Sequence, residues 1–121
     1  MAKTILTVDD SKTIRDMVSF TLQKAGYAVQ EAADGAAGAA LVAKQKFDCI
    51  ITDLNMPGMD GLALTRAVRA SATNRATPVL LLTTEADPAK KTAGREAGAT
   101  GWLVKPFNPE KLVETVRKVC P

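Results

Sequence analysis

The chain has 121 residues, of which 46% are hydrophobic, and its 16 lysines and arginines exceed its 13 aspartates and glutamates. This length predicts one domain over residues 1–121, and no apolar run approaches the roughly 20 residues of a membrane helix. Histidine is absent, which excludes Ser-His-Asp and Cys-His catalytic sites. Because the basic residues are scattered and no signal peptide is recognisable, we expect a cytoplasmic monomer that neither binds nucleic acid nor inserts into membranes.

Short apolar runs alternate along the chain with segments of helical periodicity. The apolar runs predict strands at 5–8, 27–32, 48–52, 78–83 and 101–104. The segments between and after them predict helices from Ser11 to Gly26, over 35–45 and 61–70, from Pro88 to about Gly98, and from Pro109 onward. Asp87–Pro88 and Asn108–Pro109 are typical helix starts, since each pairs a capping side chain with a proline.

Five strand–helix units in succession predict an α/β fold in which parallel strands are joined by helical crossovers. The runs at 5–8, 48–52 and 78–83 are continuously apolar, as in strands that are covered on both faces. Right-handed crossovers with one change of winding direction give a doubly wound, five-stranded parallel sheet. The order 2-1-3-4-5, with five helices, is the smallest arrangement that places the most apolar strands in the middle.

Polar residues follow the predicted strands at the point where each strand ends. They are Asp9 and Asp10 after the first strand, Asp53 and Asn55 after the third, Thr83, Thr84 and Glu85 at the end of the fourth, and Lys105 and Pro106 after the fifth. In a doubly wound sheet these positions share one edge, where ligands bind. Any one of these residues alone is more often a turn former, a cap or a surface side chain, but the whole set indicates a site.

The three aspartates are expected to repel one another, because neighbouring strands lie about 4.8 Å apart. At roughly 5 Å and an effective dielectric near 20, each pair costs about 3 kcal/mol. Lys105 lies two strands from Asp53, about 10 Å away at the backbone, and a lysine stem of roughly 6 Å together with the aspartate side chain can close that gap. One lysine against three acids leaves a charge of −2, and an all-oxygen ligand set favours Mg²⁺ to neutralise it. The sequence therefore predicts a carboxylate nucleophile for phosphoryl transfer, Asp53, beside a magnesium site.

Four motifs carry a resemblance that covers essentially the whole chain: VDDS at 8–11, DLNMPGMDG at 53–61, PVLLLTTEA at 78–86 and GATGWLVKPF at 98–107. On these motifs the sequence resembles the receiver domains of two-component response regulators, most closely the CheY-like regulators of chemotaxis. The resemblance implies their flavodoxin-like fold. It also implies a signalling switch rather than an enzyme. This switch nevertheless catalyses the phosphorylation and dephosphorylation of its own aspartate.

The resemblance further implies a role for each polar residue at the sheet edge. The phosphoacceptor is Asp53, and the Mg²⁺ ligands are Asp9, Asp10, Asp53 and the backbone carbonyl of Asn55, with Asp10 a more direct ligand than Asp9. The phosphate-binding and switch residues are Thr83, Thr84 and Lys105, the switch aromatic is Trp102, and the Lys105–Pro106 peptide bond is cis. Asn55 and Glu85 tune dephosphorylation, which is expected within about a minute, and the branched side chain of Thr84 is expected to slow phosphotransfer.

The implied partners are a CheA-like histidine kinase as phosphodonor and an output partner that binds helix 4, strand 5 and helix 5, with a phosphatase as a further candidate. The basic residues expected on those helices favour an acidic partner such as a flagellar motor switch protein; they are Lys90, Lys91, Arg95, Lys111, Arg117 and Lys118. A phosphate sink or a phosphorelay intermediate without motor output stays open as an alternative.

Two other classes are disfavoured. A Mg²⁺-dependent phosphohydrolase with an aspartate nucleophile usually has a second acid two residues further on, where this chain has Asn55. A flavin-binding module of the same fold needs a hydroxyl- and glycine-rich loop after the first strand, where this chain has two acids.

Overall fold

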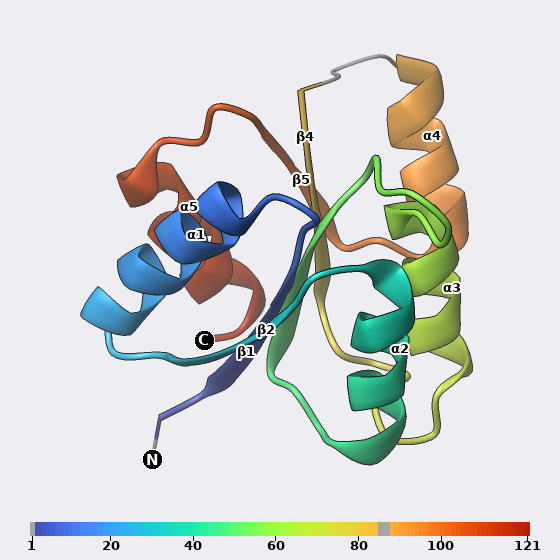
Figure 1. Cartoon of the computed structure of the whole chain (residues 1–121), viewed down its shortest axis with the longest axis horizontal. Helices are drawn as coiled ribbons and strands as arrows, with labels where there is room; N and C mark the ends of the chain where they lie inside the picture. The colour runs from blue at the N-terminus through green and yellow to red at the C-terminus, as the bar shows by residue number, and fades with distance from the viewer. Residues whose placement is uncertain (1, 85–87) are drawn as a thin grey trace.

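The computed structural model of the chain describes residues 2–84 and 88–121, in which strands and helices alternate (Figure 1). The strands are β1 (Thr4–Val8), β2 (Ala28–Ala32), β3 (Cys49–Asp53), β4 (Val79–Thr83) and β5 (Gly101–Val104). The helices are α1 (Lys12–Lys24), α2 (Gly35–Lys44), α3 (Gly61–Ala70), α4 (Pro88–Ala97) and α5 (Pro109–Val119). None of the helices in these two ranges has the length and apolar character needed to traverse a bilayer.

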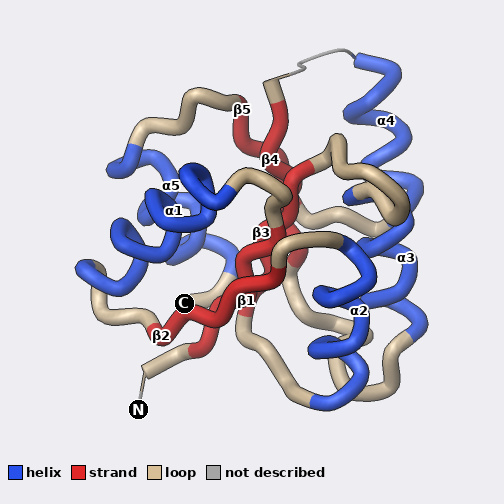
Figure 2. The backbone as a smooth tube through the Cα atoms, viewed as in Figure 1, coloured by secondary structure: helices blue, strands red, loops and turns tan. Residues whose placement is uncertain are grey.

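The strands are all parallel and form one sheet in the order β2-β1-β3-β4-β5, as the sequence predicts. Figure 2 shows this sheet as a middle layer, with α1 and α5 on one face and α2, α3 and α4 on the other. The doubly wound α/β fold is therefore confirmed. The winding direction changes between β1 and β3, so a ligand site is expected at the carboxyl ends of these two strands.

Apolar side chains bury both faces of the sheet, and β3 and β4 are buried along their whole length. Successive residues of a strand point to opposite faces. Ile51 accordingly belongs to a cluster with Leu22 of α1 and Leu112 of α5, whereas Ile50 belongs to a second cluster with Leu64 of α3. Each such side chain contributes about 1.5–3 kcal/mol by leaving water. This rigid double core holds the strand ends that carry the polar residues.

Side-chain caps fix where the helices begin. Ser11, Asp34, Asp60 and Asn108 each accept a hydrogen bond from a backbone N–H in the first turn of the helix that follows. A cap of this kind stabilises a helix by about 1 kcal/mol. The predicted cap at Asp87 lies outside the described residues. Because the capped helices start a few residues after the strands, the connecting loops stay short and hold their polar residues close to the sheet edge.

The third strand extends one residue further than the sequence predicts. Asp53, which was expected to follow the strand, is its last residue and is paired with Leu82 of β4. The pairing continues because the backbone N–H of Leu54 donates to the carbonyl of Leu82 at 3.0 Å. The backbone of Asp53 is thus fixed by the sheet rather than by a loop.

At the amino ends of the strands, the buried side-chain amide of Asn74 connects the loops that precede β3 and β4. Its Oδ1 accepts hydrogen bonds from the backbone N–H of Phe47 at 2.9 Å and from Thr77 Oγ1 at 3.0 Å. Its Nδ2 donates to the carbonyls of Val42 and Gln45, both at 2.7 Å. Since Asn74 is 0% exposed, these four bonds replace all its contacts with water.

Candidate functional site

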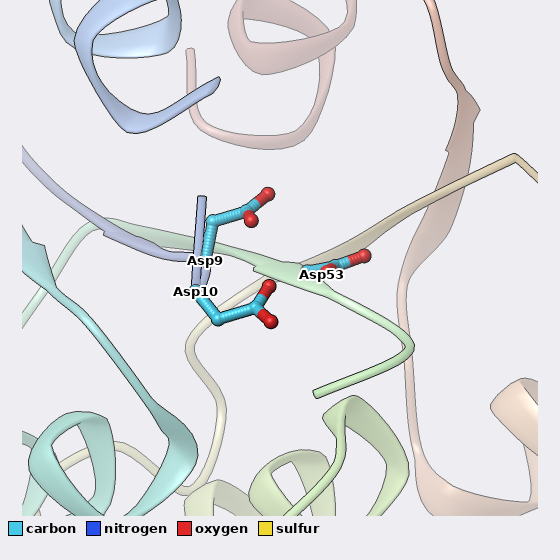
Figure 3. Close-up of side chains that lie close together, drawn as sticks. All are labelled: Asp9, Asp10 and Asp53. Atoms are coloured by element: carbon cyan, nitrogen blue, oxygen red, sulfur yellow. The ribbon is translucent and has the colours of Figure 1, made fainter. Parts of the chain in front are cut away.

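The carboxyl ends of β1 and β3 bring Asp9, Asp10 and Asp53 together (Figure 3). The strands are hydrogen-bonded neighbours, and the last paired residues are Val8 and Thr52, each directly before an aspartate. One carboxylate oxygen from each of the three aspartates lies within 4.8 Å of the others. Figure 3 shows the three side chains extending to the same side of the strand ends. The structure thus brings together the three acids that the sequence predicts to be close.

Lys105 places its ammonium between two of these carboxylates. Its Nζ lies 3.1 Å from Asp9 Oδ2 and 3.1 Å from Asp53 Oδ1. The backbone N–H of Lys105 donates to the carbonyl of Thr83 at 2.7 Å, and the Lys105–Pro106 peptide bond is cis. The side chains of Lys105, Asp9 and Asp53 are 15%, 2% and 8% exposed. Because water screens these ion pairs poorly, they are stronger than pairs on the open surface.

Burial and charge raise the pKa of both Asp53 and Lys105. Desolvation is the largest cause for Asp53, followed by the charge of Asp9, and Lys105 only partly offsets them. Burial acts to lower the pKa of Lys105, but the two carboxylates outweigh it, so this pKa is raised. Because the folded protein binds a proton at Asp53 more tightly than the unfolded chain does, this group's contribution to stability falls as the pH rises through its folded pKa. Ionised Asp53 is therefore held at a cost in stability.

Asp9 and Asp10 differ in environment although they are adjacent. Asp9 is 1% exposed, and its Oδ1 accepts a hydrogen bond from the backbone N–H of Ser11 at 2.9 Å. Its Oδ2 contacts Lys105, so both of its oxygens already have donors. Asp10 is exposed and offers more accessible oxygens to a cation than Asp9 does; its role as a direct ligand stays a prediction.

The loop after β3 closes directly over the backbone of Asp53. The N–H of Gly61 donates to the carbonyl of Leu54 at 2.9 Å, and a Cβ at position 61 would overlap the carbonyl oxygen of Asp53. Glycine is required here because any side chain would push the loop and Asp53 apart. The sequence indicates Gly61 only as a helix start, since this close approach is a tertiary contact.

The remaining polar residues of the predicted site lie at the same sheet edge. Thr83 is the last residue of β4 and is buried, whereas Thr84 and Asn55 are exposed. Glu85, predicted to tune dephosphorylation, lies outside the described residues. Thr83 is paired with Val104 in the register of β4 and β5. Because Val104 directly precedes Lys105, Thr83 lies close to the lysine that contacts Asp53.

Trp102 packs between β5 and α4. Its indole lies over Gly94, where an added Cβ would be 3.0 Å from Cζ3 of the ring. The indole Nε1 is buried and has no hydrogen-bond partner in the part of the chain that the structure describes. Because a buried N–H without a partner carries a cost, packing rather than hydrogen bonding holds this ring in place.

The donor set at the acidic cluster fits Mg²⁺. Asp9, Asp10 and Asp53 supply carboxylate oxygens, which are the ligands that this ion prefers. The exposure of Asp10 leaves room for the water molecules that Mg²⁺ retains. After Lys105 is counted, the cluster keeps a net negative charge that a divalent cation offsets.

Relatives of known identity cover this chain almost completely. Residues 5–117 match the response regulator receiver domain. Chemotaxis protein CheY of Pseudomonas aeruginosa is 39% identical over 116 residues, which cover 95% of this chain and 94% of that protein. Transcriptional regulatory protein ResD of Bacillus subtilis is 37% identical over 113 residues, which cover 93% of this chain and 46% of ResD. This chain thus spans about half the length of some relatives and nearly all of others.

Solved structures agree with the sequence relatives. The chemotaxis protein CheY4 of Vibrio cholerae matches with a TM-score of 0.95 and 53% identity, covering 98% of this chain and 99% of that one. Receiver domains bind Mg²⁺ at an acidic pocket, and this chain has the group Asp9, Asp10 and Asp53. The resemblance predicted from the four sequence motifs is confirmed. The chain belongs to the response regulator receiver domain family.

Proposed function

We propose that this protein is a cytoplasmic signalling switch in which a histidine kinase, with Mg²⁺, phosphorylates Asp53 and thereby changes the binding of an output partner. Receiver domains take phosphate from histidine kinases, bind output partners and are generally not classed as enzymes. The observation that carries the assignment to Asp53 is its contact with Lys105 at 3.1 Å beside two further acids. Asp53 is also the member of the cluster that lies within a strand, where it is paired with Leu82 of β4.

In this proposal, a carboxylate oxygen of Asp53 attacks the phosphorus of a phosphohistidine whose other ring nitrogen is protonated. An O–P bond forms, the N–P bond breaks, and the histidine leaves as neutral imidazole. Lys105 pairs with the phosphoryl oxygens, and the hydroxyl of Thr83 becomes a hydrogen-bond donor to them. Asp9, Asp10, Asp53 and the backbone carbonyl of Asn55 would hold Mg²⁺, which supplies positive charge to the phosphoryl oxygens. Asn55 and Glu85 would tune the later hydrolysis of the phosphoaspartate. Thr84 would restrict access to Asp53.

The switch would follow from the added charge. A phosphoryl group brings up to two negative charges beside Lys105 and Thr83. As Thr83 moves toward the new oxygens, it opens space for Trp102, whose ring is held by packing alone in the described part of the chain. Movement of this indole between β5 and α4 would alter the surface formed by α4, β5 and α5.

That surface suits an acidic output partner. Val104 of β5 is 46% exposed. Exposed basic residues lie on α4 (Lys91, Arg95) and on α5 (Lys111, Lys118), and Lys90 of α4 is half-buried. Arg117, which the sequence placed with this basic set, instead lines a groove between α1 and α5. The reason is helical geometry: Arg117 lies on the side of α5 that faces α1, with Val113 and Glu114.

Chemotaxis, with a CheA-like kinase and a flagellar motor switch protein, is the favoured setting because CheY and CheY4 match over nearly their full length. A phosphatase is a further candidate partner. The alternative, a phosphate sink or phosphorelay intermediate without motor output, stays open because regulators outside chemotaxis, such as ResD, match at a similar identity. An acidic motor-switch peptide that binds more tightly to the beryllofluoride-activated protein supports the motor, and unchanged binding supports the alternative.

Phosphorylation of Asp53 is testable with a candidate histidine kinase or with phosphoramidate. The wild-type protein is expected to gain one phosphoryl group in the presence of Mg²⁺, measured by intact mass, and Asp53→Asn none, because an amide oxygen is a poor nucleophile. Asp16→Asn is the matched control, since Asp16 is an exposed acid on α1 paired with Lys12; it should behave like wild type. Phosphorylation of Asp53→Asn at the wild-type rate would contradict the assignment.

A further inference from the structure

Arg15 of α1 reaches back from its helix to the loop that carries the acid pair. Its Nη1 donates to the backbone carbonyl of Asp9 at 2.6 Å, and its Nε lies 3.4 Å from Oε1 of Glu31 in β2. The Arg15 side chain is 14% exposed, in contrast to that of Lys12 one turn earlier, which is 77% exposed. The Arg15 side chain is therefore largely buried and packed against the protein rather than solvated.

The hydrogen bond from Arg15 means that both the N–H and the carbonyl of Asp9 have partners. The N–H of Asp9 donates to the carbonyl of Ala32 at 3.2 Å, and the Asp9 carbonyl accepts from Arg15. That carbonyl belongs to the peptide unit that joins Asp9 to Asp10. Asp10 itself is exposed, and no hydrogen bond or ion pair among the described residues holds its side chain. The starting point of the Asp10 side chain, its Cα–Cβ bond, is thus set by the backbone that Arg15 holds.

Direct attraction to Mg²⁺ cannot explain the positive charge of Arg15 at this position. A cation near the acid pair repels Mg²⁺, so a purely electrostatic role would oppose metal binding. Glu31 lies beside the guanidinium and offsets that charge. The remaining explanation for Arg15 is its hydrogen bond to the Asp9 carbonyl. That bond constrains a loop that carries a proposed metal ligand, Asp10.

We propose that Arg15 is a positioning residue for the magnesium site: its guanidinium, neutralised by Glu31, holds the Asp9–Asp10 peptide so that the Asp10 carboxylate faces the cation. The inference rests on the proposed Mg²⁺ function of the acid cluster. It assigns to α1 and β2 a part in metal binding that the acids alone do not reveal.

The test is Mg²⁺ affinity, measured by isothermal titration calorimetry on the full chain. Arg15→Met is expected to raise the Kd for Mg²⁺ by about tenfold, as for other residues that orient metal ligands. Loss of the positive charge alone would lower the Kd, so the sign of the change separates positioning from electrostatics. Lys12→Met removes the same charge from an exposed site on α1 and is expected to leave the Kd nearly unchanged.

Two further variants make the test independent of a folding defect. Arg15→Lys keeps the charge but shortens and reshapes the donor, and is expected to weaken Mg²⁺ binding while remaining folded. Glu31→Gln keeps the bond to Asp9 and is expected to change the Kd much less than Arg15→Met. Faster amide hydrogen exchange at Asp10 and Ser11 in Arg15→Lys would support the proposal. If wild type binds Mg²⁺ and the Arg15 variants bind it equally or more tightly, the proposal is overturned; if wild type binds none, the magnesium site fails as well.

Discussion

Replacing Asn74 with alanine is expected to lower the free energy of unfolding by about 4 kcal/mol. The substitution removes the acceptor of the Phe47 N–H and the amide donor to the Gln45 carbonyl. The Thr77 hydroxyl and the Val42 carbonyl also lose their bonds to Asn74 but keep contacts with the Phe47 carbonyl and with Ser71 Oγ. Each buried polar group that loses its partner costs about 1–3 kcal/mol. For a domain whose total stability is about 5–15 kcal/mol, this loss is large. Urea unfolding monitored by circular dichroism measures it.

Thr73→Ala is the matched control, because Thr73 precedes Asn74 in the same turn and is exposed. It should change stability by less than about 0.5 kcal/mol. An Asn74→Ala protein as stable as the Thr73→Ala protein would show that water enters and satisfies the abandoned groups. The Asn74 network would then have no special part in joining the loops that precede β3 and β4.

Replacing Lys105 with methionine is expected to tighten Mg²⁺ binding while it prevents productive phosphorylation. The ammonium lies 3.1 Å from both Asp9 and Asp53, so it competes with the metal for the same carboxylates. Its removal should strengthen Mg²⁺ binding by about 1–3 kcal/mol, roughly five- to 150-fold in Kd. Phosphotransfer should fall by at least about a hundredfold, since a charge that pairs with the phosphoryl oxygens is lost. Calorimetry and intact mass measure the two effects separately.

The Lys105→Met substitution is also expected to change the melting temperature of the protein. Without Mg²⁺, the Lys105→Met protein holds three acids near one another with no ammonium between them, so its melting temperature should fall below that of wild type. Added Mg²⁺ should restore most of that loss by binding the folded state. Lys46→Met, at an exposed lysine, is the control and should show neither effect. Weaker Mg²⁺ binding in Lys105→Met would contradict the competition between lysine and metal.

The sheet order and the acid cluster were predictable because both depend on local patterns. Continuous apolar runs identified β1, β3 and β4 as central strands, and parallel strands place their carboxyl ends on one edge. Once that edge was known, Asp9, Asp53 and Lys105 had to lie near one another. The distances at which Lys105 contacts both acids agree with the reach that strand spacing allowed.

Residues whose role depends on tertiary contact could not be predicted in the same way. Arg15 lies in a helix where arginines are usually solvated, and only the return of its side chain to the Asp9 carbonyl distinguishes it. Asn74 stands in a polar stretch typical of an exposed loop, although its side chain is 0% exposed. Gly61 is required by the approach of its loop to the Asp53 backbone, which no local pattern encodes.

The central claim is that the crowded carboxylates at the ends of β1 and β3 bind one magnesium ion and thereby prepare Asp53 for phosphorylation. Calorimetric titration of the metal-free protein with MgCl₂, alongside Asp10→Asn, tests it most directly. One saturable Mg²⁺ per wild-type chain is predicted, with binding strongly weakened in Asp10→Asn because the most exposed carboxylate of the cluster is lost. Absence of saturable binding to wild type, or equal binding to both proteins, would contradict the account.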